Sequence, residues 1–346
     1  MDSLKRLADW FLYSRIYADG AYRSHYSTCK LGFIYPEITA YAISLCCILY
    51  KRTKESRFLE RAEVCAQYMR KISKNGAVSC PSDNFLYAFD TGIYISSMFD
   101  IYDCTEEEIY LRDSKKSLKW LYSLWNGSHF SAVDKPSMDT IWYHCDSVHL
   151  VKLAIPLLKA TKCLGDEKYK DTALTLLQEY KQLQEKDGRF RLNHISAITM
   201  THPHCYATEG YLYAYYATQN KEFLDIALKA ANWLSKIQNK DGSIYRAYCP
   251  QENQKNDRIY EKLKTSDATA QATRIWKLLG INKTNIEVAY KYLDSEMNGG
   301  LRLLRKDSLA EKLFSWQKPI YSWPTFFFIH SLSLPFGEVN YTKELF

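Results

Sequence analysis

The sequence lacks the local signatures of several common functions. Its 346 residues contain neither GxxxxGK[ST] nor GxGxxG, so no phosphate-binding or dinucleotide-binding loop is indicated. No GxSxG elbow occurs, which leaves a nucleophilic serine without its local motif. The ten cysteines form no CxxC pair, and Cys46, Cys47 and Cys205 lie in apolar helical runs. We interpret them as reduced core thiols and expect a reducing, cytoplasmic location.

Long apolar runs are also missing. No stretch approaches 18 uncharged apolar residues, and the N-terminal segment MDSLKRLADWFLYSR has charges scattered through it instead of an apolar h-region. We therefore expect neither a signal peptide nor a membrane span. The formal net charge of +7 is modest, and lysines in stretches such as KRTKESR are mixed with acids, so we expect no nucleic-acid partner.

What the sequence does contain is a unit of roughly 50 to 60 residues that recurs about six times. Each unit has a glycine turn, a loop and then an apolar helix with a polar tip. The turns are Asp19-Gly20, Asn75-Gly76, Asn126-Gly127, Asp187-Gly188, Asp241-Gly242 and Gly299-Gly300. A repeat of this length indicates one supersecondary unit used again and again, so we predict a single domain over residues 1–346.

Two classes of helix alternate along the chain. Helices that follow the turns, such as AYAISLCCILY and GYLYAYYAT, are apolar nearly all round, as expected of helices packed on every side. The helices between them, such as KEFLDIALKAANWLSKIQ, carry lysines on one face and apolar residues on the other. Alternation typical of strands is brief, as in GRFRLNHI and GSIYRAY. We therefore predict an all-α (α/α)6 toroid of two nested helical rings, with short extended segments in the loops.

Two stretches resemble known toroid families. IQNKDGSIY and LQEKDGRFR resemble the Q-x-x-D-G-x-aromatic signature shared by terpenoid-cyclase-like toroids and six-hairpin glycosidase-like enzymes, although this chain has DGRF and DGSIY where the latter often have DGGW. YPEITAY is similar to the Y-P-E-[VI]-T-G-Y stretch of uncharacterised toroid proteins associated with polysaccharide metabolism. The resemblance covers essentially the whole chain. It implies the fold and a link to carbohydrates, and it assigns no enzyme family.

Acidic residues recur at the starts of the predicted inner helices. In an α/α toroid these helix ends converge on one funnel, so Glu37, Asp90, Asp146 and Asp267 are expected to face a common cavity, with Glu209 one turn deeper. Helix capping and the helix dipole also favour acids in a first turn, so this role stays open as the alternative for each residue.

Glycosidic bond cleavage needs two carboxyl groups, a proton donor and an ionised base or nucleophile. We predict Asp90 and Asp146 as this pair, because their helices would be neighbours in the ring, and Glu37 as a further catalytic candidate. The remaining acids and the aromatic residues at the same helix ends are predicted to bind substrate; they are Tyr35, Tyr143, Tyr206, Glu209, Asp267 and Trp323.

Histidines at two helix starts suggest an alternative chemistry. His144 and His204 titrate near neutrality in their ordinary state, so they could remove and return a proton, as in a sugar epimerase. Epimerases of the N-acylglucosamine type share the toroid fold and are thought to use histidines. The resemblance is one of available residues, since no motif matches residue by residue.

Metal chemistry is a weaker alternative. His144, Cys145 and Asp146 resemble the zinc ligands of protein prenyltransferases in type, but consecutive helical residues point about 100° apart and cannot all bind one ion unless the helix starts later. A shared site of Cys205, Asp146 and His204 stays open. No DxDD or DDxxD run supports terpenoid cyclisation. We expect no metal and no cofactor.

The predicted function is thus that of a carbohydrate-active enzyme working on a sugar or oligosaccharide by carboxylate and histidine acid–base catalysis. Hydrolysis or elimination comes first and epimerisation second. The alternatives are a non-catalytic toroid that binds a glycan or a protein, and a prenyltransferase-like or terpenoid-cyclase-like protein. The sequence leaves the sugar and the oligomeric state open.

Overall fold

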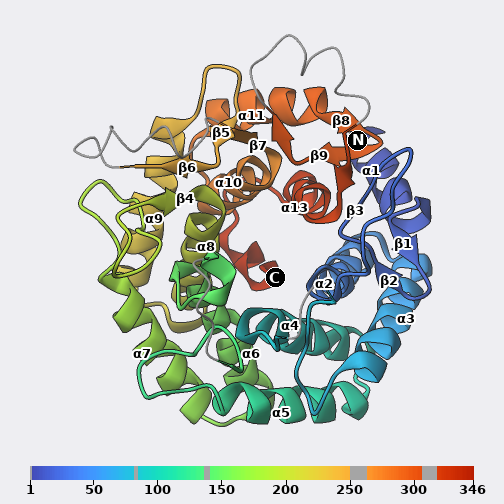
Figure 1. The fold of residues 1–346 in the computed structure, drawn as a ribbon, viewed down its shortest axis with the longest axis vertical. Helices are drawn as coiled ribbons and strands as arrows, with labels where there is room; N and C mark the ends of the chain where they lie inside the picture. Colours follow the sequence, from blue (N-terminus) through green and yellow to red (C-terminus); the bar gives the residue numbers. More distant parts are fainter. Residues whose placement is uncertain (1, 82–84, 136–140, 250–262, 306–317) are drawn as a thin grey trace.

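A computed structural model describes residues 2–81, 85–135, 141–249, 263–305 and 318–346 of the chain. Helices form two nested rings around a common centre (Figure 1). The inner ring consists of α2 (Pro36–Thr53), α4 (Ala88–Thr105), α6 (Ala154–Leu164), α8 (Thr201–Thr218), α10 (Ser266–Leu279) and α13 (Ser322–Ser333). The outer ring consists of α1 (Asp2–Tyr13), α3 (Ser56–Ile72), α5 (Glu108–Tyr122), α7 (Lys168–Lys181), α9 (Lys221–Ile237) and α11 (Lys283–Ser295).

The two ends of the chain close the ring. Each inner helix from α2 to α10 packs against the outer helix that follows it, whereas α13 packs against α1 from the beginning of the chain (Figure 1). A four-stranded antiparallel sheet joins the same regions, with strand order β3-β11-β9-β8 and Ile320 paired with both Tyr26 and Arg302. The predicted (α/α)6 toroid with short extended segments is therefore confirmed.

The strands are short and lie in the loops between the rings. They are β1 (Tyr17–Ala18), β2 (Ala21–Tyr22), β3 (His25–Tyr26), β4 (Thr199–Met200), β5 (Ile244–Tyr245), β6 (Ala247–Tyr248), β7 (Lys264–Thr265), β8 (Met297–Asn298), β9 (Gly300–Arg302), β10 (Leu304–Arg305) and β11 (Ile320–Tyr321). Several immediately precede an inner helix, so they direct the chain into its first turn.

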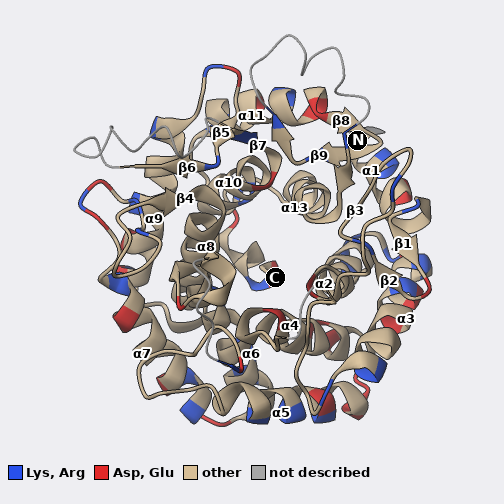
Figure 2. Cartoon of the chain, viewed as in Figure 1, with Lys and Arg blue, Asp and Glu red and all other residues tan. Residues whose placement is uncertain are grey.

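The hydrophobic pattern of a helix indicates whether it lies in the inner or the outer ring. Along α8 the segment Pro203–Ala214 is buried throughout, because its neighbours cover every face. In α9 the buried residues recur at helical spacing and the lysines lie on the other side, as an outer helix requires. Figure 2 shows the same division, with most charged residues on the outer helices. None of the helices within the described ranges is long and apolar enough to cross a bilayer.

The glycine turns recur with one backbone conformation. Gly20, Gly76, Gly127, Gly188, Gly242 and Gly299 all have positive φ, between 86° and 104°. Residues with a Cβ rarely adopt this conformation. These turns reverse the direction of the chain after an outer helix and lead it back to the start of the next inner helix.

A recurrent hydrogen bond ties each turn to the following helix. In five units the residue two positions after the turn glycine donates its backbone N–H to a side chain in the first turn of that helix. The pairs are Tyr22 with Thr39 (3.0 Å), Val78 with Thr91 (3.0 Å), Phe190 with His204 (3.1 Å), Ile244 with Thr269 (3.1 Å) and Leu301 with Thr325 (2.9 Å). We call the accepting residues anchors. They satisfy a backbone donor that would otherwise be buried without a partner.

The third unit departs from this pattern. The segment WYHCDSVHLVKLAIPLLKA, residues 142–160, was expected to be one helix. The chain instead forms a 3₁₀ turn, η1 (Trp142–His144), then a second 3₁₀ segment, η2 (Val148–Leu153), and only then α6. The segment η2 packs closely between α4 and α8, where two glycines leave room for it. A Cβ on Gly92 of α4 would lie 2.2 Å from the Leu153 side chain, and a Cβ on Gly210 of α8 would lie 2.6 Å from the Val151 carbonyl oxygen. Asp146 therefore precedes the helix and is not in its first turn.

Candidate active site

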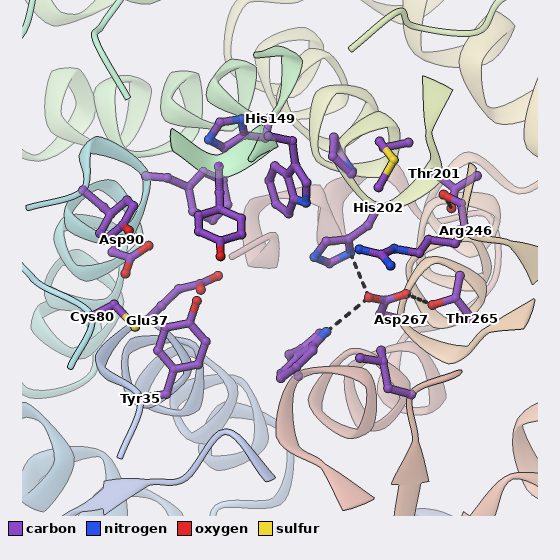
Figure 3. Close-up of a pocket in the computed structure, with 18 of the residues that line it drawn as sticks. Tyr35, Glu37, Cys80, Asp90, His149, Thr201, His202, Arg246, Thr265 and Asp267 are labelled. Carbon is purple, nitrogen blue, oxygen red and sulfur yellow. Dashed lines mark hydrogen bonds and ion pairs between the residues drawn. The ribbon is translucent and has the colours of Figure 1, made fainter. Parts of the chain in front are cut away.

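The first turns of the inner helices surround a cavity of about 490 Å³. The residue two positions before each anchor faces it: these residues are Glu37, Phe89, His202, Asp267 and Trp323, from five different helices. Figure 3 shows Glu37 and Asp90 on one side of this cavity, and His202 and Asp267 on the other. Residues far apart in sequence thus meet because five of the units present the same helix position to the centre.

Glu37 lies on the first turn of α2 and is only 7% exposed. Burial raises its pKa to about 7, although hydrogen bonds from Tyr35 and Tyr41 and the nearby Lys152 ammonium act in the opposite direction. Near neutral pH its carboxyl group is therefore divided between the protonated and ionised forms. A group in this state can donate a proton to a bound ligand.

Asp90 is the second carboxyl group on this side of the cavity. It lies on the first turn of α4, the inner helix that packs against α2, and is 5% exposed. Tyr35 lines the same region, and the charges of both Glu37 and Asp90 raise its phenol pKa further above the value set by burial. The two carboxyl groups therefore share one electrostatic environment.

Asp267 organises the opposite side. Its Oδ1 accepts hydrogen bonds from the Thr265 hydroxyl and, at 2.6 Å, from the backbone N–H of Ala268. Its Oδ2 accepts the indole N–H of Trp323 at 3.2 Å and lies 3.6 Å from Nδ1 of His202 (Figure 3). Because four protein groups surround it, Asp267 is placed to orient the indole and the imidazole.

His202 combines burial with hydrogen bonding. Burial lowers its pKa despite the Asp267 carboxylate and Gln271, which both favour the charged form. Its Nδ1 lies 2.6 Å from the Gln271 side-chain oxygen, which can only accept a hydrogen bond. Nδ1 therefore carries the proton, and Nε2 is the unprotonated nitrogen.

A buried charge cluster forms the layer beneath the cavity. Lys152 of η2 lies 2.8 Å from Glu209 of α8, and Glu209 also pairs with Arg274 of α10. None of the three is more than 1% exposed. The Lys152 ammonium lies 4.4 Å from the ring centre of Tyr206 and 5.0 Å from that of Tyr41. This cluster brings positive charge close to Glu37 without reaching the cavity.

The structure brings together many of the predicted site residues. Those that line the cavity are Tyr35, Glu37, Asp90, Tyr143, Asp267 and Trp323. Tyr206 and Glu209 were also expected to meet substrate, but they lie below. The Tyr206 ring packs 4.4 Å from His202 and 4.9 Å from Phe89, which cover it. The roles of the lining residues remain predictions.

Three predicted catalytic residues do not line the cavity. Asp146 instead accepts the backbone N–H of Ala132 at 2.7 Å, and its side chain is 42% exposed beside His129. In the third unit Asp146 thus accepts a hydrogen bond from a buried backbone N–H, as the anchors do in the other five units. The prediction that it faces Asp90 across the cavity is wrong.

The two predicted histidines are likewise held elsewhere. His204 is an anchor: its Nδ1 accepts from Phe190 and its Nε2 donates to the Ala230 carbonyl at 3.2 Å. Burial lowers its pKa to about 3, so it stays neutral. His144 lies behind the lining residue Tyr87, whose hydroxyl is 2.7 Å from its Nε2. Neither imidazole reaches the cavity.

The predicted site residues leave out His149, His202 and Arg246, which do line the cavity. His202 lies two positions before His204 in the same HPHCY run, and the spacing from the anchor is the signal that identifies it. His149 lies in an apolar stretch and had no such signal, because its unit has an irregular helix start. Arg246 lies in the loop between β5 and β6. The sequence alone does not predict whether a loop residue of this kind faces the cavity.

The residues considered for a shared metal site do not converge. Cys205 is directed at the Ala268 carbonyl at 3.8 Å, while Asp146 and His204 bond to other backbone groups. Within the described ranges no group of three or more His, Cys, Asp or Glu side chains is arranged to hold a metal ion. The expectation of a metal-free protein stays a prediction.

Comparison with known proteins identifies the fold. No protein-family model matches the sequence, and no curated protein matches it. Solved structures match over nearly the whole chain. An unsaturated glucuronyl hydrolase specific for heparin aligns with a TM-score of 0.70 at 14% identity, covering 95% of this chain and 94% of its own.

Two further solved structures with a similar fold belong to enzymes of other kinds. Cellobiose 2-epimerase from Bacillus thermoamylovorans B4167 aligns with a TM-score of 0.77 at 10% identity, covering 96% of this chain and 99% of its own. The GH76A α-1,6-mannanase from Salegentibacter sp. HEL1_6 aligns with a TM-score of 0.67 at 11% identity, covering 96% and 97%. The chain therefore has the same (α/α)6 toroid fold as these solved structures.

Proposed function

We propose that this protein is a carbohydrate-active enzyme that cleaves a glycosidic bond at the central cavity. The observation that carries the proposal is the pairing of two buried carboxyl groups, Glu37 and Asp90, on adjacent inner helices, with the pKa of Glu37 raised to about 7. Glu37 donates a proton to the leaving oxygen. Asp90 is the second carboxylate, acting as base or nucleophile.

Aromatic side chains supply the surface for a sugar ring. Trp323, held by Asp267, lines the cavity, and Tyr35, Trp142 and Tyr143 add further aromatic side chains to the lining. Such faces pack against the apolar faces of sugars while their polar edges reach hydroxyl groups. The fold neighbours support the class of substrate, since their names describe enzymes that act on glycans.

Turnover of defined glycans tests the proposal. The purified protein is incubated with an unsaturated glucuronyl disaccharide, α-1,6-mannotriose and cellobiose, and the products are identified by mass spectrometry and NMR. Glu37→Gln and Asp90→Asn are each expected to lower turnover by about 10² to 10⁴. Asp146→Asn is the matched control, because this carboxylate lies outside the cavity and its loss should leave turnover intact. Binding of a glycan without any turnover would instead identify a non-catalytic glycan-binding toroid.

A second candidate is sugar epimerisation, favoured by the geometry of His202. Its Nδ1–H is held by Gln271, so Nε2 is the basic nitrogen of a neutral imidazole that lines the cavity. An epimerase of this kind would remove a proton from the sugar and return one. Incorporation of deuterium into cellobiose recovered from D₂O, lost in His202→Gln, would select this function over hydrolysis.

The compartment also remains a proposal. Cys46, Cys47, Cys65 and Cys205 are buried thiols. This usage supports a reducing, cytoplasmic location.

A further inference from the structure

His149 lines the cavity and has a buried nitrogen, Nε2, that the proposed catalytic pair does not use. The residue is 1% exposed and lines the cavity beside the wall that carries Asp90 (Figure 3). Its Nδ1 lies 2.5 Å from the hydroxyl oxygen of Ser147. Its Nε2 forms no hydrogen bond with any residue in the described part of the chain. A buried polar atom of this kind needs an explanation.

The Ser147 hydroxyl determines which nitrogen carries the proton. This hydroxyl lies 3.1 Å from the carbonyl oxygen of Trp142, an atom that can only accept a hydrogen bond. Since a hydroxyl has one proton to donate, the bonds to Trp142 and His149 coexist only if Ser147 donates to Trp142 and accepts from His149. The proton of the imidazole is therefore on Nδ1, and Nε2 carries a lone pair.

The surroundings keep the imidazole neutral and in place. Its ring centre lies 5.2 Å from that of Phe89 and 5.1 Å from that of Trp142, which it meets edge to face. Burial, together with the charge that His202 can carry, lowers the pKa of His149 to about 3. Between pH 5 and 8 Nε2 is thus an acceptor only. It attracts a hydrogen-bond donor and repels a carboxylate or carbonyl oxygen.

We infer that Nε2 of His149 accepts a hydrogen bond from the ligand, in a subsite bounded by Phe89 and Trp142, and that the donor is a sugar hydroxyl. The sugar part of this inference rests on the proposed function. The acceptor part rests only on Ser147 and on the unbonded Nε2. An amide N–H of an N-acetylated sugar has the same donor chemistry, so the test includes both sources.

Calorimetric binding at pH 7 tests the subsite. Glucose, galactose, mannose, glucuronate and N-acetylglucosamine are titrated first, followed by the monodeoxy analogues of the tightest binder. One deoxy analogue should bind wild type about ten- to a hundredfold more weakly, because it leaves Nε2 without its partner. His149→Phe should bind parent and analogue equally. If only N-acetylglucosamine shows the effect, the donor is the amide and the hydroxyl assignment is overturned.

A matched control separates this effect from a general loss of structure. His204 has a similarly low pKa and is as buried, but both of its nitrogens bond to backbone. His204→Gln should lower stability and retain the discrimination between parent and deoxy sugar. If His149→Phe still discriminates, the inference fails while the proposed function stands. If wild type binds none of the sugars, the proposed function fails as well.

Nitrogen-15 NMR of labelled histidine gives a readout that does not depend on a substitution. In the free protein Nε2 of His149 should have the shift of an unprotonated ring nitrogen, and saturating sugar should move that signal toward the hydrogen-bonded range. Ser147→Ala removes the group that selects the tautomer, so both nitrogens should then show averaged shifts. A protonated Nε2 in wild type, or a signal that sugar does not change, would overturn the inference.

Discussion

The ammonium of Lys152 lies 2.8 Å from the carboxylate of Glu209, and both side chains are almost completely excluded from solvent, at 1% and 0% exposure. Burial lowers the pKa of Lys152 to about 8, so the ion pair with Glu209 is retained at neutral pH. Burial also opposes ionisation of Glu209, but Arg274 and Lys152 together outweigh it and lower that pKa. The cluster thus has two cations for one carboxylate and lies next to Glu37.

We predict that substitutions of Glu209 and Lys152 lower the free energy of unfolding by different amounts. Glu209→Gln leaves Lys152 and Arg274 as unpaired buried cations and should lower the free energy of unfolding by about 3–5 kcal/mol. Lys152→Met should cost less, because Arg274 still neutralises Glu209. Urea unfolding at pH 7 measures both. Glu167→Gln, from the exposed pair with Lys170, is the control and should change stability by about 0–1 kcal/mol. Equal effects at the buried and exposed pairs would contradict the prediction.

The raised pKa of Glu37 predicts a pH dependence of stability. Its folded pKa of about 7 exceeds the ordinary value of 4.5, so the folded state binds more protons than the unfolded state between these values. The contribution of Glu37 is therefore full below pH 4.5 and is lost as pH rises toward 7. The loss is on the order of 3 kcal/mol, from about 1.4 kcal/mol per pKa unit.

Glu37→Gln isolates this effect. Below pH 4.5 the free energy of unfolding should change with pH in the same way for wild type and variant. From pH 4.5 to 7 the variant should become more stable relative to wild type. Buried histidines such as His149 and His204 contribute the opposite slope, with stability lost at low pH, but they are present in both proteins and cancel. The measurement is urea unfolding at half-unit steps from pH 4 to 8. A difference that does not vary with pH would mean that Glu37 ionises normally, and its role as proton donor would fall with it.

The turn glycines give a prediction about the fold. A Cβ on Gly242, at φ +92°, would lie 2.2 Å from the carbonyl oxygen of Val288, whereas a Cβ on Gly127, at φ +104°, would meet nothing within 4 Å. Gly127→Ala should therefore cost only the conformational penalty, about 1–2 kcal/mol. Gly242→Ala should cost clearly more, because α11 must move. Thermal and urea unfolding of the two variants would show equal losses if the backbone contact were unimportant.

The sequence carries the architecture in patterns that act locally. Glycines at the six turns allow positive φ, and the two kinds of helical hydrophobic pattern separate buried inner helices from amphipathic outer ones. These signals depend on neighbouring residues, so a single sequence suffices to predict the toroid. The same patterns place Glu37, Asp90 and Asp267 in first helical turns, where the structure has them.

Which first-turn residue faces the cavity is a finer question, and the sequence does not decide it. Consecutive helical residues point about 100° apart, so a small error in the helix start moves a side chain from the cavity to another wall. This is why His202 lines the cavity while His204 anchors a turn. Asp146 was misplaced for the same reason, since its helix begins later, at Val148.

The sequence by itself therefore determined the closed ring, its repeated turns and the set of helix ends that could form a site. Only the tertiary structure decided the pairing of buried charges and the tautomers of the histidines. Glu209 lies 57 residues from Lys152 and 65 from Arg274, and the Nδ1 proton of His202 depends on Gln271, 69 residues away. Contacts of this kind exist only after neighbouring units have packed together, because burial and hydrogen bonding between residues distant in sequence, and not local propensity, select them.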